Sequence, residues 1–578
     1  MAPTDQLQEV KIMLHGTAAS EGIGIGKVML IEEHSLEYTP RTVTDTEAES
    51  QRFKAAVDAF CYNTEKQAEN LRSSAGEKEA EILAGHIQII KDPYLSGEIE
   101  KLIADGQCAE SALEHMCDMF ITMFSAADDE LTKQRAADVR DIKSGVLGIL
   151  LGVNEIKVSD APKGTVLVAR ELTPSVTAGI VKENIAGIIT ETGGTTSHSA
   201  ILARALEIPA VLSVEGVASS LKNGDTVVVD GSEGAVIVNP DDNTVAEYSK
   251  KRDAFLAERK ELENYRGRET KSASGEVYEL FCNIGKPEDA VKAVDADGEG
   301  VGLFRTEFLF MDRTSIPTED EQFEAYKKAA LILKGKSLII RTLDIGGDKD
   351  IPYLGLEKEE NPFMGFRAIR YCLKNRELFK SQIKAILRAS AFGDIKIMFP
   401  LITTMDELRE GKKLVAECKA DLRNMGINFN ENIQVGVMVE TASAAVIADM
   451  LAKEADFFSI GTNDLTGYTM ACDRGNNDVS YLYSPLQPSV LRMIKRTIEC
   501  GVQNGISVGM CGEAAANKLM IPLLISFGLT EFSVSAPSVL NVRKIISTWT
   551  KEDADKDTAK VLEMSTQQEI VEYLKSVV

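Results

Sequence analysis

Eight short apolar segments, each followed by a stretch of helical character, occupy the last half of the chain, from about residue 272 to residue 578. They begin at Glu279, Gly300, Ser337, Ile395, Ile433, Phe457, Ser507 and Phe532. Eight strand-then-helix units predict a (β/α)₈ barrel, which usually takes about 250 residues. A doubly wound open sheet is the alternative, but no dinucleotide-binding loop follows the first strand. We therefore expect a TIM barrel over residues 272–578.

The first half of the chain has a different pattern. Residues 45–151 form long runs with few Gly or Pro, in which apolar residues recur at intervals of three and four, as in amphipathic helices. Short β-rich pieces separated by turns follow in residues 152–240, and one earlier β-like piece covers residues 24–32. We therefore expect a helical subdomain inserted in a β/α domain, so that the chain is multidomain α/β. The expected parts are residues 1–44, 45–151, 152–240, a charged helical linker over 241–271, and the barrel.

Composition excludes several classes of protein. The net charge of −25 argues against nucleic-acid binding, which depends on Lys and Arg that neutralise phosphates. Nine cysteines without zinc spacing indicate reduced thiols rather than a disulfide framework. No apolar run reaches the roughly 18 residues that a membrane helix needs, and no secretory signal opens the chain. We therefore expect a cytoplasmic protein that does not insert into membranes.

Charged and polar side chains repeatedly follow the ends of the predicted barrel strands, where barrel enzymes place their catalytic groups. They are Arg305, Glu307, Arg341, Asp344, Lys349, Glu440, Asn463, Asp464, Arg474, Cys511 and Glu513, with Arg367 on the helix after the third strand. Guanidinium groups suit phosphate and carboxylate oxygens. Carboxylates such as Glu440 and Asp464 suit Mg²⁺. Salt bridging around the rim explains any single arginine equally well, but it does not explain the whole set.

His198 is the second candidate. It stands at the start of a predicted helix directly after a glycine-containing loop, where free N–H groups and the helix dipole favour an attached anion. Thr177 could bond one ring nitrogen and so select the tautomer. A lone histidine is usually structural, but none of the other four has a comparable setting. We therefore expect His198 to be functional.

Several long motifs resemble those of one enzyme family. GGTTSHSAILAR (193–204) resembles the phosphohistidine signature of the phosphoenolpyruvate-utilising enzymes, and DFFSIGTNDLTGYTMACDRGN (456–476) resembles their second signature. GLFRTEFLFMDR, IIRTLDIGGDK, ENPFMGFRAIR, VMVET and GMCGE are similar to the barrel motifs of the same family. The resemblance covers nearly the whole chain in order. It is strongest to the branch that serves the bacterial sugar phosphotransferase system.

This resemblance implies a function and a set of roles. His198 would accept the phosphoryl group of phosphoenolpyruvate at Nε2 and pass it to the carrier protein HPr, with release of pyruvate. Glu440 and Asp464 would hold Mg²⁺, and Cys511 would protonate the enolate. The residues that would bind phosphoenolpyruvate are Arg305, Arg341, Lys349, Asn463 and Arg474, with Arg367 nearby. HPr would dock on the helical subdomain, the phosphohistidine domain would swivel, and the barrel would form a homodimer.

The chain departs from the family pattern at two positions. Gly467 stands where the second signature usually has Gln, and Ala442 stands where the barrel motif usually has Pro.

Three alternative functions are also considered. A dikinase-like enzyme that uses ATP is disfavoured because no ATP-grasp segment or Walker A loop is present. A regulatory phosphoprotein would be expected to lack part of the metal or arginine set. A plain barrel lyase would leave His198 unexplained.

Overall fold

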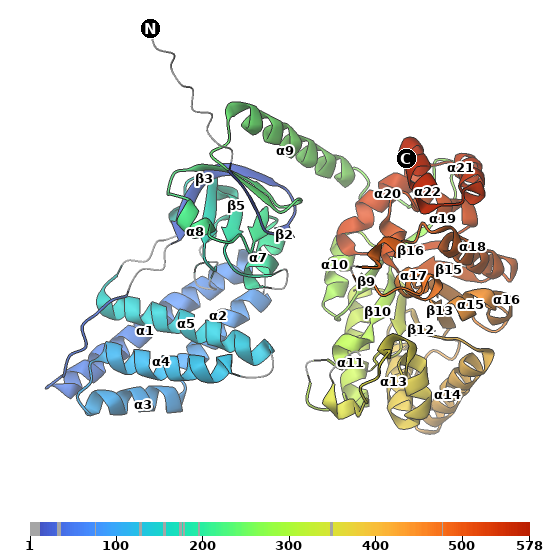
Figure 1. Cartoon of the computed structure of the whole chain (residues 1–578). Helices are drawn as coiled ribbons and strands as arrows, with labels where there is room; N and C mark the ends of the chain where they lie inside the picture. Colours follow the sequence, from blue (N-terminus) through green and yellow to red (C-terminus); the bar gives the residue numbers. More distant parts are fainter. Residues whose placement is uncertain are drawn as a thin grey trace, which may run out of the picture. The chain divides into compact units, whose positions relative to one another are not determined.

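The computed structural model describes residues 12–31, 36–74, 77–126, 130–153, 158–172, 176, 180–194, 197–311, 313–346, 351–474, 476 and 478–578. The chain divides into two compact units, Met1–Arg259 and Lys260–Val578 (Figure 1). Each unit has its own hydrophobic core. The units are therefore described separately.

Unit 1 is built on one eight-stranded sheet with the order β1-β8-β7-β3-β4-β5-β6-β2. The strands β3 to β6 run parallel in that order, whereas β7, β8 and β2 pair antiparallel with their neighbours. The five residues of β4 are all buried, as expected for an apolar run in the middle of a covered sheet. The bounds are β1 Ile12–His15, β2 Thr17–Ser20, β3 Ile23–Ile31, β4 Thr165–Ala169, β5 Ile185–Thr190, β6 Ala210–Leu212, β7 Thr226–Asp230 and β8 Ala235–Val238.

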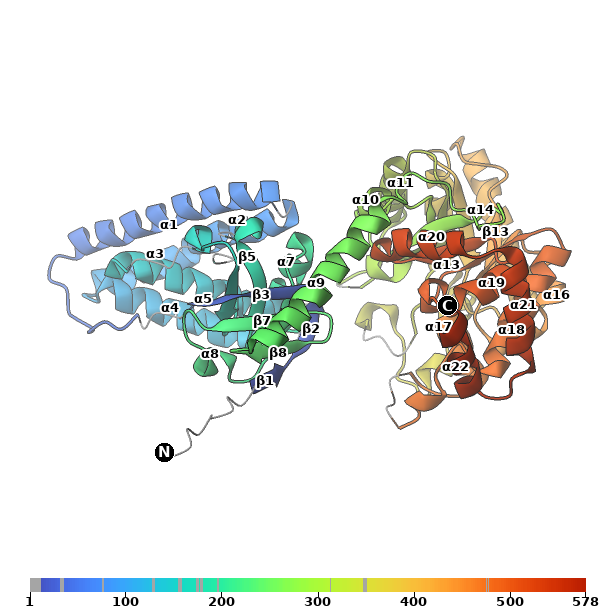
Figure 2. The same ribbon diagram turned by 90° about the horizontal axis from the view of Figure 1, so that it is seen from above.

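Five long helices lie between β3 and β4 in the sequence, although these two strands are paired neighbours in the sheet. They are α1 Thr46–Ser74, α2 Glu77–Ile90, α3 Pro93–Ala104, α4 Ala109–Ser125 and α5 Glu130–Leu151. The bundle has its own core, which includes Phe53, Ile99 and Leu113. Ala68 and Leu83 instead join the core of the β/α part. The bundle, drawn in blue tones, is thus an insertion that packs against the domain it interrupts (Figure 2).

The helices described in the β/α part and directly after it are α7 His198–Leu206, α8 Val217–Ser220 and α9 Asp242–Glu263. The sequence predicts a charged helical linker over residues 241–271, which includes α9. The structure shows that Tyr248 of α9 is buried against Val228 and Ile237. Arg259, one turn from the end of the helix, pairs with Glu207 at 2.8 Å. The larger part of α9 therefore belongs to unit 1, against which Tyr248 packs.

Unit 2 is a closed barrel of eight parallel strands, β9 to β16, which confirms the predicted TIM barrel. The barrel closes where β16 pairs with β9, with Glu531 opposite Glu279. An inner layer of Leu303, Ile339 and Met398, among others, fills the interior. The bounds are β9 Glu279–Ile284, β10 Val301–Arg305, β11 Leu338–Arg341, β12 Ile395–Phe399, β13 Val435–Val439, β14 Phe457–Ile460, β15 Ser507–Met510 and β16 Glu531–Val534.

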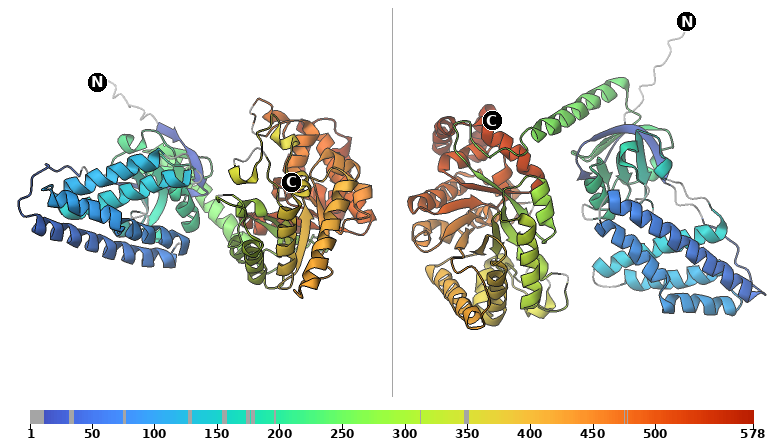
Figure 3. Two further views of the ribbon diagram at one scale, coloured as in Figure 1. Left: turned by 90° about the horizontal axis from the view of Figure 1, so that it is seen from below. Right: turned by 180° about the vertical axis from the view of Figure 1, so that it is seen from behind.

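The helices of unit 2 cover the outside of the barrel strands (Figure 3). They are α10 Asp289–Asp295, α11 Glu319–Leu333, α12 Ala368–Lys374, α13 Arg376–Ala389, α14 Met405–Asn424, α15 Ala442–Val446, α16 Ala448–Leu451, α17 Thr462–Met470, α18 Pro488–Gln503, α19 Ile521–Phe527, α20 Val539–Thr548, α21 Lys551–Glu563 and α22 Gln567–Val577. Capping boxes at Thr318, Thr404 and Thr566 satisfy the first N–H groups of α11, α14 and α22. Among the described residues, no helix has the length and apolar character that crossing a bilayer requires.

Candidate active site

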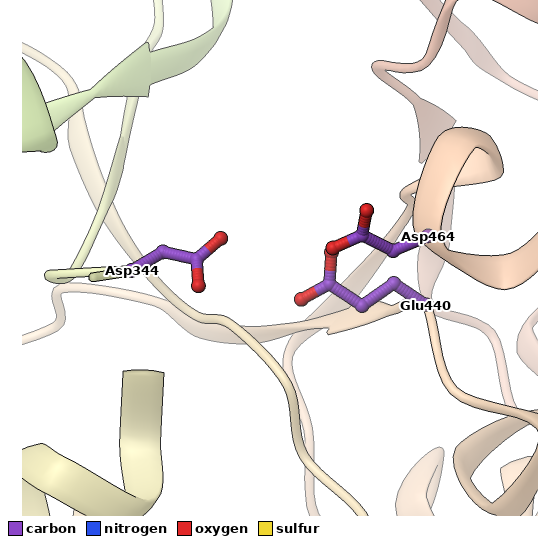
Figure 4. Close-up of side chains that lie close together, drawn as sticks. All are labelled: Asp344, Glu440 and Asp464. Atoms are coloured by element: carbon purple, nitrogen blue, oxygen red, sulfur yellow. The ribbon is translucent and has the colours of Figure 1, made fainter. Parts of the chain in front are cut away.

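Three carboxylates converge at the carboxyl ends of the barrel strands. Asp344 follows β11, Glu440 follows β13, and Asp464 lies in the first turn of α17, just after β14. One oxygen from each lies within 4.8 Å of the others (Figure 4). Asp344 and Glu440 are buried, whereas Asp464 is partly exposed. The cluster contains both residues that the sequence predicts as Mg²⁺ ligands and adds Asp344, for which no metal role is predicted.

Burial and mutual repulsion destabilise the ionised forms of these three carboxylates, so that a nearby positive charge would stabilise them. Burial raises the pKa of Glu440 well above its ordinary range, and the Asp464 and Asp344 carboxylates raise it further. Burial also raises the pKa of Asp464, which nearby arginines partly offset. The Leu401 N–H donates to Glu440 Oε1 at 2.6 Å and so orients that carboxylate. A divalent cation with oxygen ligands would relieve the repulsion, and the donor set fits Mg²⁺.

Two buried arginines alternate with the carboxylates. Arg341 at the end of β11 contacts Glu307 at 2.5 Å and Asp344 at 2.9 Å. The adjacent carboxylates raise the pKa of Arg341, although burial alone would lower it.

Arg367 also pairs with Asp344, at 2.7 Å, and lies 3.5 Å from Asp464. The Nε atoms of Arg341 and Arg367 are buried and have no hydrogen-bond partner within the described part of the chain. Such buried donors are costly unless an acceptor arrives, which favours an anionic ligand at this mouth.

Three more of the predicted substrate ligands, which the structure describes, lie around the same end of the barrel. Arg305 is the last residue of β10 and the register partner of Arg341 on β11. The Asn463 side chain donates to Glu513 Oε1 at 3.3 Å and accepts from the Glu513 N–H at 3.4 Å. Arg474 is exposed, and its charge lowers the pKa of Asp464. Lys349 lies outside the described residues.

Cys511 lies just beyond β15 and packs in the inner layer of the barrel. Its Sγ donates to the Ile460 carbonyl at a distance of 3.8 Å. Burial raises the pKa of the Cys511 thiol to about 11, an effect that the nearby Arg341 charge opposes. The sulfur therefore carries its proton at neutral pH, which suits a proton donor better than a nucleophile.

His198 is the first residue of α7, as the sequence predicts, and Ser197 caps this helix. The Ala200 N–H donates to Ser197 Oγ at 3.3 Å, and the preceding Gly193 has a φ of 104°. The backbone of His198 therefore lies at a helix amino terminus, where an attached anion is favoured. Thr177 lies outside the described residues, so its predicted role stays a prediction. His198 belongs to unit 1, whereas the carboxylates and arginines belong to unit 2.

Some residues that contact the predicted site residues have no role assigned to them from the sequence. Glu307 and Asp344 were visible only as strand-end charges, and their contacts with the arginines appear only in the folded barrel. Tyr468 on α17 donates its hydroxyl hydrogen to the Phe363 carbonyl and lies 3.4 Å from Arg367 Nη1. Spacing four residues after Asp464 on one helix is the signal that could have indicated it.

Comparisons with known proteins match both halves of the chain to the same enzyme family. Three family models match: "PEP-utilising enzyme, N-terminal" over residues 15–135, "PEP-utilising enzyme, mobile domain" over 161–234, and "PEP-utilising enzyme, PEP-binding domain" over 259–550.

Among the curated relatives, the phosphoenolpyruvate-protein phosphotransferase of Bacillus subtilis is 46% identical over 570 residues, covering 98% of this chain and 99% of the relative. The proteins of the same name from Priestia megaterium and Listeria innocua are 46% and 45% identical, each over 97% of this chain and 98% of their own length. The chain therefore belongs to the family of phosphoenolpyruvate-utilising enzymes.

Proposed function

We propose that this chain transfers the phosphoryl group of phosphoenolpyruvate to His198 and then to the histidine of the carrier protein HPr, releasing pyruvate. This would be the first step of the sugar phosphotransferase system. The observation that carries the proposal is the barrel mouth, where Arg341 and Arg367 hold buried, unbonded Nε donors beside three carboxylates. Similarity over nearly the full length to phosphoenolpyruvate-protein phosphotransferases supports the choice of reaction.

In this proposal the arginines bind the substrate and the carboxylates bind the metal ion. Phosphoryl transfer depends on positioning and charge compensation rather than on covalent chemistry by the barrel. Arg305, Arg341, Lys349, Asn463 and Arg474 bind the phosphate and carboxylate of the substrate, and Arg367 lies beside them. Glu440 and Asp464, with Asp344, would hold Mg²⁺, which supplies positive charge for the phosphate oxygens. The ion pairs of Arg341 and Arg367 keep both guanidinium groups in place before the substrate arrives.

The chemical step breaks the bond between phosphorus and the enol oxygen while a bond from phosphorus to His198 Nε2 forms. Thr177 fixes the tautomer that leaves this nitrogen free to attack. The departing electron pair produces the enolate of pyruvate. Cys511 gives its thiol proton to carbon three of the enolate, and the resulting thiolate regains a proton from solvent. A thiol whose pKa is raised to about 11 releases its proton only to a strong base, and the enolate is one.

The second transfer occurs away from the barrel. HPr docks on the helical subdomain of residues 45–151, next to the phosphohistidine domain of residues 152–240. His198 and the substrate ligands belong to different units, so unit 1 must approach the barrel mouth and then leave it. The nucleophile has to come within about 3 Å of the phosphorus to react. The segment 241–271, which contains α9, connects the two parts, and the barrel of residues 272–578 forms a cytoplasmic homodimer.

The decisive experiment is incubation with ³²P-labelled phosphoenolpyruvate and Mg²⁺, with and without HPr. We expect an acid-labile label on this chain that moves to HPr when the carrier is added. His198→Ala should fold normally and take no label, while His115→Ala, a substitution at an exposed histidine of α4, should label normally. Undiminished labelling of the His198→Ala protein, or no labelling of the wild type, would contradict the proposal.

A further inference from the structure

Tyr483 supports the segment that carries the substrate ligands of α17, although it lies twenty residues further along the chain. It follows the short 3₁₀ turn Ser480–Leu482 and is partly buried. Its hydroxyl donates to the Asn463 carbonyl at 2.9 Å. Asn463 is the second residue of α17, directly before Asp464. One bond thus connects the loop after the second signature to the start of the catalytic helix.

The same hydroxyl faces the charged groups of the mouth. Burial raises the pKa of Tyr483, and the charge of Arg474 together with a hydrogen bond from it acts in the opposite direction. The carboxylates of Asp464 and Glu513 add to the increase. The charge of Arg474 therefore acts on the same hydroxyl that donates to the Asn463 carbonyl. These are two of the residues that we assign to phosphoenolpyruvate.

Gly467 lies on the side of α17 that faces the Tyr483 ring. A Cβ atom at this position would stand 3.9 Å from Tyr483 Cε2 and 3.3 Å from the Cys472 carbonyl oxygen. A methyl group at position 467 would thus be in ordinary van der Waals contact with the tyrosine ring, so this position faces the ring. The departure of this chain from the family signature thus falls on the side of α17 next to Tyr483.

The two ends of Asn463 are held differently. Its backbone oxygen accepts the 2.9 Å bond from Tyr483, whereas its side chain makes only long contacts of 3.3 and 3.4 Å with Glu513. Hydrogen bonds weaken as they lengthen beyond about 3.2 Å. The amide group can therefore exchange Glu513 for a ligand while the tyrosine keeps the backbone in place.

We infer that Tyr483 is a positioning residue for phosphoenolpyruvate, whose hydroxyl holds the Asn463 carbonyl and so keeps the start of α17 in place beside the charge of Arg474. It does not touch the reacting atoms. The inference rests on the proposed function, because the roles of Asn463 and Arg474 do. It predicts weaker substrate binding, with little effect on the chemical step, when the hydroxyl is removed.

The test compares Tyr483→Phe with Tyr481→Phe in the full-length protein. Tyr481 lies two residues away and its side chain is 73% exposed, so it is a matched control. Initial rates of HPr phosphorylation are measured against phosphoenolpyruvate concentration at saturating Mg²⁺. We expect KM for phosphoenolpyruvate to rise about five- to tenfold in Tyr483→Phe, as for one lost hydrogen bond, with kcat changed less than about twofold. Tyr481→Phe should match the wild type.

Two further measurements separate positioning from general damage. Phosphoryl transfer backward from phospho-HPr to His198 uses unit 1, so it should be unchanged in Tyr483→Phe. The melting temperature, followed by the fluorescence of Trp549 in unit 2, should also be unchanged.

An unaltered KM in Tyr483→Phe overturns the inference, and so does an equal rise in Tyr481→Phe. A fall in melting temperature together with lost back-transfer also overturns it, because the role is then structural. A wild type that takes no phosphate from phosphoenolpyruvate would refute the proposed function instead.

Discussion

Glu531 offers a quantitative test of the barrel interior, because its carboxyl group is buried among the barrel strands. It is the first residue of β16 and only 5% exposed. Its Oε1 atom has no hydrogen-bond partner within the described residues. Cβ atoms added at Gly302 and Gly509 would come within 2.4 and 2.8 Å of this oxygen, so two glycines create the space for it. Replacement by Gln preserves the shape and removes the acidic proton.

The magnitude follows from the pKa. Burial raises the pKa of Glu531 to about 8, the neighbouring Glu279 adds to this, and Lys396 opposes it. The unfolded chain has an ordinary Glu pKa of about 4.3 to 4.5. The folded state therefore holds a proton that the unfolded state releases between these two values. The stabilisation linked to this proton is fully present below about pH 4.5 and is lost as pH rises through about 8. From pH 5 to pH 8 the loss amounts to roughly 3.5 kcal/mol of unfolding free energy.

The assay is denaturant unfolding of the wild type and of Glu531→Gln at several pH values between 5 and 8. Trp549 is the single tryptophan of the chain and is buried in unit 2, so its fluorescence reports on the barrel. We expect the unfolding free energy of Glu531→Gln to gain roughly 3.5 kcal/mol on that of the wild type across this range. Taking the difference between the two proteins cancels the contribution of other titrating groups, provided that the m-values agree.

The control is Glu563→Gln, which alters an exposed carboxyl at the end of α21. Its pH profile should run parallel to that of the wild type. If the profile of Glu531→Gln also runs parallel to the wild type, the buried carboxyl does not hold its proton in the folded barrel. The same result would mean that Glu531 finds a cation or a water cluster that keeps it ionised.

Two further predictions concern the chemistry at the mouth. Cys511→Ala should bind phosphoenolpyruvate with nearly the wild-type dissociation constant by calorimetry but lower kcat by about 10² or more, because the enolate loses its proton donor; unchanged turnover would leave Cys511 a packing residue only. Glu440→Gln or Asp464→Asn should abolish Mg²⁺-dependent labelling from phosphoenolpyruvate while His198 still accepts phosphate from phospho-HPr, measured with ³²P in both directions. Loss of both reactions would argue that the substitution disrupts folding rather than the metal site.

The periodicity of the sequence was sufficient to predict the barrel. Parallel strands buried on both faces require near-continuous apolar runs, such as Ile395–Phe399 and Val435–Val439, and these are local features of the chain. Strand ends at Arg341 and Glu440 were predictable for the same reason, since they follow directly from the strands. The long motif around His198 predicts that this histidine is the nucleophile. The boundaries of the five parts and the roles of the site residues stay predictions.

Only the tertiary structure decided which charges meet and which are buried. Asp344 joins Glu440 and Asp464 because β11, β13 and β14 end on one rim, a contact between segments distant in sequence. A glutamate at the start of a strand is usually exposed to solvent, but the pairing of β16 with β9 buries Glu531. Tyr483 reaches Asn463 across a loop whose path no local pattern specifies. Local apolar spacing determines the elements, whereas long-range packing determines the surroundings of each charge, and those surroundings control the pKa values and the bonds of the site.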